Sequence, residues 1–183
     1  MEIPGQLSVE INTVQSKSLE LNGVHVGDSY KRAWFTLFQR GYVRSLTNET
    51  ITTSFGPEVK AGQSDSGRSL RHYLFWNGKG SSVEVYTLSV PAGEIVTQII
   101  TRETGATPER YSFLVRRYRG LGAPTTDAGA MYWCIYSRGP DCGPQGSRID
   151  EQLYLRERDG VIESKLTAGA MLESYWVKGR KSY

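Results

Sequence analysis

The hydrophobic positions of this chain recur mainly at every second residue. In the segment 7–11, Leu7, Val9 and Ile11 alternate with polar residues. Such alternation is typical of a β-strand that buries one face, because successive side chains of a strand point to opposite sides. Similar alternation, or a dense run of aromatic and β-branched residues, is found in segments 19–26, 32–38, 70–76, 83–88, 111–118 and 131–136. We therefore expect strands throughout the chain.

Turn signals separate these segments at short intervals. Asn22-Gly23, a second Asn-Gly pair at 77–78 and an Asp-Gly pair at 159–160 each stand between apolar runs, which favours tight β-hairpin turns. The sequence therefore predicts an all-β protein with a single domain over 1–183. The expected architecture is a β-sandwich, with the jelly roll as a candidate topology. At most one short helix is expected, near 106–112, where Thr107 can cap it and Pro108 can occupy its first turn.

Three tryptophans are expected to anchor the core of this domain. Trp34, Trp76 and Trp133 each stand in the middle of an apolar segment. Large aromatic side chains in such segments usually pack inside a β domain.

The composition narrows the classes of partner. The 183 residues carry a net charge of +3, with 38% hydrophobic and 22% charged residues, as in ordinary soluble globular proteins. No run of five like charges is present, so nucleic acid is a weak candidate partner. No apolar stretch approaches the ~20 residues of a transmembrane helix, and the first residues lack the features of a signal peptide. A cytoplasmic or virion-associated location is expected if the first functional hypothesis below holds.

Few residues carry the chemistry of a metal or cofactor site. His25 and His72 lie far apart in the sequence and no clustered ligand spacing is present, so neither a metal nor a cofactor is expected. Cys134 and Cys142 either bridge across a hairpin or remain free thiols. Asn48 begins a glycosylation sequon, which matters only in a secreted chain.

The interleaving of arginine with aromatic residues is the most distinctive feature. On a strand, Arg117 and Arg119 would share one face and repel each other unless an anion or a partner lay between them. A second aromatic and basic segment closes the chain. The candidate interface residues are Arg116, Arg117, Arg119, Tyr175, Trp176 and Arg180.

Three functional hypotheses follow. The first is a non-enzymatic surface-recognition or self-assembling structural subunit, like a viral or phage structural protein, with a second copy or another protein as partner. The second is a β-sandwich that binds membranes or glycans, such as a pore-forming cytolysin or a lectin. Aromatic residues clustered on one loop end would favour the second, and aromatic residues spread over several faces the first. The third is a glycosidase with a carboxylate pair drawn from Glu84, Glu94 and Glu173.

Overall fold

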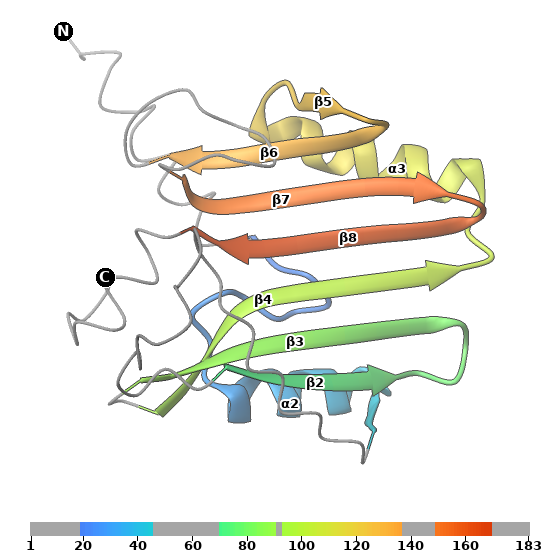
Figure 1. Ribbon diagram of the computed structural model, residues 1–183. Coiled ribbons are helices and arrows are strands. Elements are labelled where there is room, and N and C mark those ends of the chain that lie inside the picture. Colours follow the sequence, from blue (N-terminus) through green and yellow to red (C-terminus); the bar gives the residue numbers. More distant parts are fainter. Residues whose placement is uncertain (1–18, 46–69, 91–92, 137–148, 170–183) are drawn as a thin grey trace, which may run out of the picture.

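The computed structural model describes residues 19–45, 70–90, 93–136 and 149–169. Their strands form one antiparallel sheet (Figure 1) with the order β1-β2-β3-β4-β8-β7-β6-β5. The mostly β fold predicted from the alternation is confirmed. The strands are β1 (Val43–Arg44), β2 (Leu70–Trp76), β3 (Ser81–Val90), β4 (Gly93–Thr104), β5 (Thr125–Asp127), β6 (Ala130–Tyr136), β7 (Ile149–Arg158) and β8 (Val161–Ala168).

The sheet consists of two four-stranded meanders that meet in its middle. Strands β1 to β4 pair in sequence order, and so do β5 to β8. The two meanders are joined by the pairing of β4 with β8, in which Ile99 lies opposite Leu166. The sheet therefore ends in its two shortest strands, β1 and β5.

Tight turns join the strands where the sequence predicted them. Asn22 and Gly23 both adopt positive φ angles, and so do Asp159 and Gly160, which is the backbone of a two-residue turn. The Asn-Gly pair at 77–78 lies in the connection between β2 and β3, where the Asn77 side chain accepts hydrogen bonds from two backbone N–H groups. The hairpins at 77–78 and 159–160, which join β2 to β3 and β7 to β8, are confirmed. The Asn22-Gly23 turn closes only an isolated bridge between Leu21 and Val24, so the prediction of strands over 19–26 is wrong.

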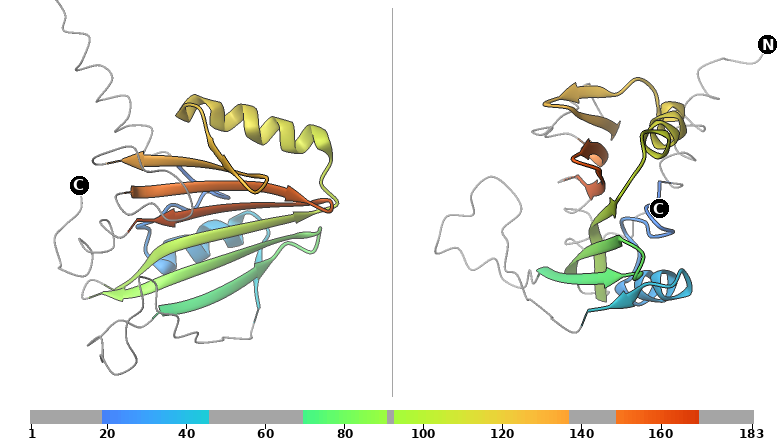
Figure 2. Two further views of the ribbon diagram at one scale, coloured as in Figure 1. Left: turned by 45° about the horizontal axis from the view of Figure 1, so that its top comes forward. Right: turned by 90° about the vertical axis from the view of Figure 1, so that its right-hand side faces the viewer.

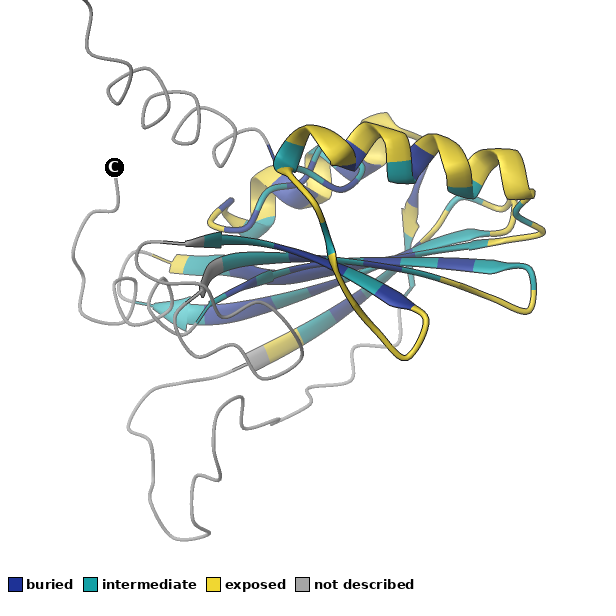
Figure 3. Cartoon of the chain, turned by 90° about the horizontal axis from the view of Figure 1, so that it is seen from above, coloured by how far each residue is buried: buried dark blue, intermediate teal, exposed yellow. Residues whose placement is uncertain are grey.

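Two helices cover one face of this sheet. Helix α2 (Tyr30–Gln39) lies over the first meander and α3 (Pro108–Tyr118) over the second, followed by the short 3-10 helix η1 (Arg119–Leu121) (Figure 2). Seen from above, both helices lie on the same side of the sheet (Figure 3). Ser29 and Thr107 cap their N-termini, each accepting a hydrogen bond from a backbone N–H three residues later.

This helical layer differs from the second sheet that a sandwich would have, and it corrects two predicted strands. Segments 32–38 and 111–118 are helical because their apolar residues also fit a period of 3.6. Ala33 and Leu37 are buried four residues apart in α2, and so are Leu114 and Tyr118 in α3. Burial of those stripes against the sheet outweighs the β propensity of the neighbouring aromatic residues. The predicted Thr107 cap and Pro108 start are both present.

The core lies between the sheet and the two helices. Its fully buried side chains include Leu37, Phe75, Ile99, Leu153 and Leu166. Of the three tryptophans expected there, only Trp133 is buried. Trp34 and Trp76 are 44% and 54% exposed, so that part of the prediction is wrong. Trp34 lies on the outer side of α2, and Trp76 lies on an outer strand, opposite exposed Val43 of β1.

Candidate functional site: a groove beside α3 and the outer face of α2

A polar groove runs along the helical face of the protein, beside α3. Two adjoining hollows of about 400 and 190 Å³ share the lining residues Asn22, Glu103 and Arg110. They are lined by the turn around residue 22, the end of α2, the β3–β4 side of the sheet and the exposed edge of α3. Segments that are far apart in the sequence therefore meet here.

The Asn22-Gly23 turn places one side of this groove. A Cβ atom on Gly23 would lie only 2.7 Å from Nη2 of Arg40, so the guanidinium group rests directly against the glycine backbone. Arg40 ends α2 and also approaches Glu20, with 3.9 Å between Nη2 and Oε1. The turn predicted from the sequence thus has a second role, because it leaves room for an arginine at the groove.

Helix α3 forms the opposite side. Arg110 donates two hydrogen bonds to the carboxylate of Glu103, at 2.8 and 2.7 Å, in a bidentate pair. Arg117, two helical turns later, lines the same groove. Within the described part of the chain Arg117 has no ion pair, so its charge is not compensated there.

The charges of Arg110, Arg117 and Glu103 all act on the hydroxyl of Tyr118. Its ring packs against Trp133, with 5.7 Å between ring centroids. Burial raises the pKa of the Tyr118 hydroxyl, while Arg117 and Arg110 lower this pKa and Glu103 raises it. The net shift is upward, so the phenol keeps its proton at neutral pH and remains a hydrogen-bond donor.

The structure changes the expected geometry of the arginine cluster. Arg116 and Arg117 lie in the last turn of α3 and Arg119 begins η1, so the predicted strand face shared by Arg117 and Arg119 is wrong. On a helix, residues three apart are neighbours, which groups Arg116 with Arg119 and separates Arg117. Arg117 alone of the three lines the groove. Tyr175, Trp176 and Arg180 lie outside the described residues.

Sequence reasoning missed Arg40, Arg110 and Glu103. Arg110 and Arg117 are seven residues apart, which is two turns of a helix, so a helical period in this segment was the available signal. Nothing in the sequence connects Arg40 or Glu103 with them, because those residues come from other elements.

The outer face of α2 is a second candidate surface. Trp34, Phe35 and Phe38 are 44%, 54% and 62% exposed, and the rings of Trp34 and Phe38 lie 6.3 Å apart. Lys31 and Arg32 share this helix, which contains no acidic residue. Arg32 pairs with Asp28 at 3.5 Å. This surface is aromatic and cationic at once.

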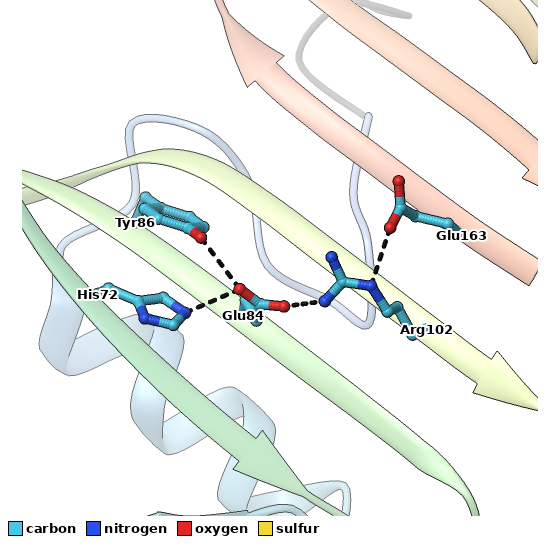
Figure 4. Close-up of polar contacts among 5 residues, drawn as sticks. All are labelled: His72, Glu84, Tyr86, Arg102 and Glu163. Atoms are coloured by element: carbon cyan, nitrogen blue, oxygen red, sulfur yellow. Dashed lines mark hydrogen bonds and ion pairs between the residues drawn. The ribbon is translucent and has the colours of Figure 1, made fainter. Parts of the chain in front are cut away.

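The opposite face of the sheet carries a network of ion pairs (Figure 4). Glu84 of β3 contacts His72 Nε2 at 2.8 Å, accepts a hydrogen bond from the Tyr86 hydroxyl at 3.0 Å and pairs with Arg102. Arg102 also donates to Glu163 at 2.8 Å. The network links β2, β3, β4 and β8, and so holds the two meanders together. Arg102 pairs with both carboxylates, and Glu84 also contacts His72 and Tyr86, which suits a structural role.

The other residues singled out in the sequence lie apart. Glu94 accepts hydrogen bonds from Tyr73 and Thr87 on the helical face, whereas Glu84 lies on the opposite face, so the two do not form a carboxylate pair. Glu173, Asn48 and Cys142 lie outside the described residues, and Cys134 is disulfide-bonded. No three metal-ligating side chains gather within the described residues, which include His25 and His72.

Comparison with known proteins gives no relative: no family model, curated protein or solved structure matches this chain. In the described part of the chain, no helix is long and apolar enough to span a membrane.

Proposed function

We propose that this protein works by non-enzymatic surface recognition and that its partner is an anionic phospholipid surface, which α2 contacts through its outer face. One observation carries the proposal: three aromatic side chains and two cationic ones occupy the exposed side of a single helix. Aromatic rings favour the boundary between lipid headgroups and acyl chains, and each basic residue near an anionic bilayer contributes about 1 kcal/mol.

The distribution of exposed apolar residues supports a local docking surface. The large exposed hydrophobic side chains among the described residues are Trp34, Phe35, Phe38, Val43, Trp76 and Phe113. Trp34, Phe35 and Phe38 lie together on α2. Trp76 alternates with His72 along β2, so Trp76 and the Val43 opposite it lie on the sheet face away from the helices. We therefore place the docking surface on α2, where three of these aromatic side chains belong to one helix.

The charges favour a bilayer over a second copy of the chain. Two copies that met symmetrically through α2 would bring Lys31 and Arg32 of one copy close to those of the other. Like charges at such a contact would repel. An anionic bilayer complements these charges.

The test is flotation of the purified protein with phosphatidylcholine vesicles, with and without phosphatidylserine. We expect binding to the phosphatidylserine vesicles, weakened by salt through screening. The double substitution Phe35→Ser and Phe38→Ser should weaken it at least about tenfold, because burying one such ring contributes ~1.5–3 kcal/mol. Phe113→Ser is the matched control, since this residue is 48% exposed on α3.

The outcome that contradicts the proposal is equally concrete. If the wild-type protein floats with neither kind of vesicle, α2 is not a membrane contact. The same conclusion follows if Phe113→Ser weakens flotation as much as the α2 double substitution. Size-exclusion chromatography with light scattering tests the alternative, in which a second copy of the chain binds to α2. A dimer that the α2 substitutions dissociate, without vesicle binding, would assign the surface to self-association.

A further inference from the structure

The groove beside α3 holds more positive than negative charge. Lys79, Arg40, Arg110 and Arg117 line its two hollows together with two carboxylates, those of Glu20 and Glu103. The bidentate pair with Arg110 occupies Glu103, and Glu20 lies 3.9 Å from Arg40. Arg117 has no carboxylate partner within the described residues. The surplus is therefore cationic, and Lys79 contributes it in the larger hollow and Arg117 in the smaller one.

Two of these cations are held in place before any ligand arrives. Glu103 fixes the plane of the Arg110 guanidinium, and the Gly23 backbone supports that of Arg40. Fixed donors lose little side-chain entropy when they bind, which favours affinity. The Tyr118 hydroxyl, which keeps its proton, lies within the field of both Arg110 and Arg117. The groove thus combines ordered donors with an uncompensated charge.

We infer that this groove binds a small phosphate-bearing anion, with Arg117 as its principal contact. Guanidinium groups match phosphate oxygens with two parallel hydrogen bonds. Arg117 lines the smaller hollow, of about 190 Å³, which adjoins the larger one of about 400 Å³, so there is room beside Arg117 for a small anion. The inference goes beyond the proposed docking through α2 and does not depend on it, because none of the α2 aromatic residues lines the groove.

The first experiment titrates inorganic pyrophosphate into the full-length protein at low ionic strength and measures the heat of binding by isothermal titration calorimetry. We expect saturable binding that weakens as salt is added. Arg117→Ala should weaken it at least about tenfold, because hydrogen bonds to charged groups are strong. Arg116→Ala is the matched control: it removes the same charge from the neighbouring position of α3, outside the groove, and should change the affinity less than about twofold.

A second arm distinguishes a free anion from a lipid headgroup. The protein is floated with phosphatidylcholine vesicles that contain phosphatidic acid, in the Phe35→Ser and Phe38→Ser background, so that docking through α2 does not contribute. Flotation that Arg117→Ala abolishes would identify a lipid-borne phosphate as the ligand. Pyrophosphate binding without flotation would identify a free one. Either result supports the groove.

The inference is overturned by two results. One is the absence of saturable binding in both arms, and the other is equal weakening by Arg116→Ala and Arg117→Ala, which would reflect general charge alone. Arg117 is exposed, so its substitution should leave the fold intact, and an unchanged thermal midpoint checks this. Arg40→Ala provides a second, independent variant from the opposite side of the groove.

Discussion

Helices α2 and α3 lie in one layer, on one face of the same sheet, yet their outer faces carry different chemistry. Each begins with a hydroxyl cap and buries two side chains four residues apart. Outside those stripes, α2 exposes Trp34, Phe35 and Phe38. The corresponding surface of α3 includes the arginines Arg116 and Arg117.

The difference shows which residues the fold requires and which it leaves open. A helix on a sheet needs an apolar stripe on one side only, and its other side is constrained mainly by solubility. Three half-exposed aromatic residues on α2 leave apolar surface in contact with water, which is unfavourable. Their presence is therefore better explained by a contact with another surface than by the fold. The arginines of α3 are compatible with both water and an anionic ligand.

The largest expected difference in the free energy of unfolding is between a substitution in the buried contact under α3 and one on the outer face of α2. Trp133→Ala should lower the free energy of unfolding by ~3–5 kcal/mol, because the ring is 3% exposed, packs on Tyr118 and donates a hydrogen bond to the Gly122 carbonyl. Trp34→Ala should lower it by less than about 1 kcal/mol. Urea denaturation measures both. Similar losses for the two variants would mean that α2 is packed as closely on its outer side as on its inner side.

An intermediate effect concerns Tyr30, the first residue of α2. Burial raises its pKa from 10.0 to about 12, and its hydroxyl has no hydrogen-bond partner among the residues that the structure describes. The folded protein therefore holds this proton more tightly than the unfolded chain does. The resulting stabilisation is complete below pH 10 and is lost as the pH rises towards 12.

Tyr30→Phe removes this proton and the unpartnered hydroxyl together. We expect equal or slightly greater stability at neutral pH, and a smaller fall in the free energy of unfolding at alkaline pH than in the wild type. Denaturation curves across that pH range measure the fall. An unchanged alkaline fall in the variant would assign it to other tyrosines, such as Tyr118 at the end of α3, whose pKa is also raised by burial.

The smallest expected effect lies at the C-terminal end of α3. Arg116→Ala combined with Arg119→Ala should destabilise the protein by about 1 kcal/mol or less, because within the described part of the chain these exposed cations have no ion pair and act mainly on the helix dipole. The loss should shrink further in high salt. A loss of several kcal/mol in thermal denaturation would show that these side chains hold the fold and are not available to a partner.

The sequence by itself determined the local structure. Alternation predicted the strands around Phe75 and Val85, and the Asn-Gly and Asp-Gly pairs predicted the hairpin turns, because backbone conformation at those sites depends on neighbouring residues. The start of α3 was also local, since Thr107 and Pro108 act within one turn.

Only the tertiary structure decided the second layer and the candidate site. The segment that contains Trp34 has the residues of a strand, and it becomes a helix because Ala33 and Leu37 can then cover the sheet together. The groove joins Glu20, Arg40, Glu103 and Arg117, which lie on four separate elements. Their distances depend on how β4 and α3 are packed, and long-range packing of this kind leaves no periodic signal in the chain.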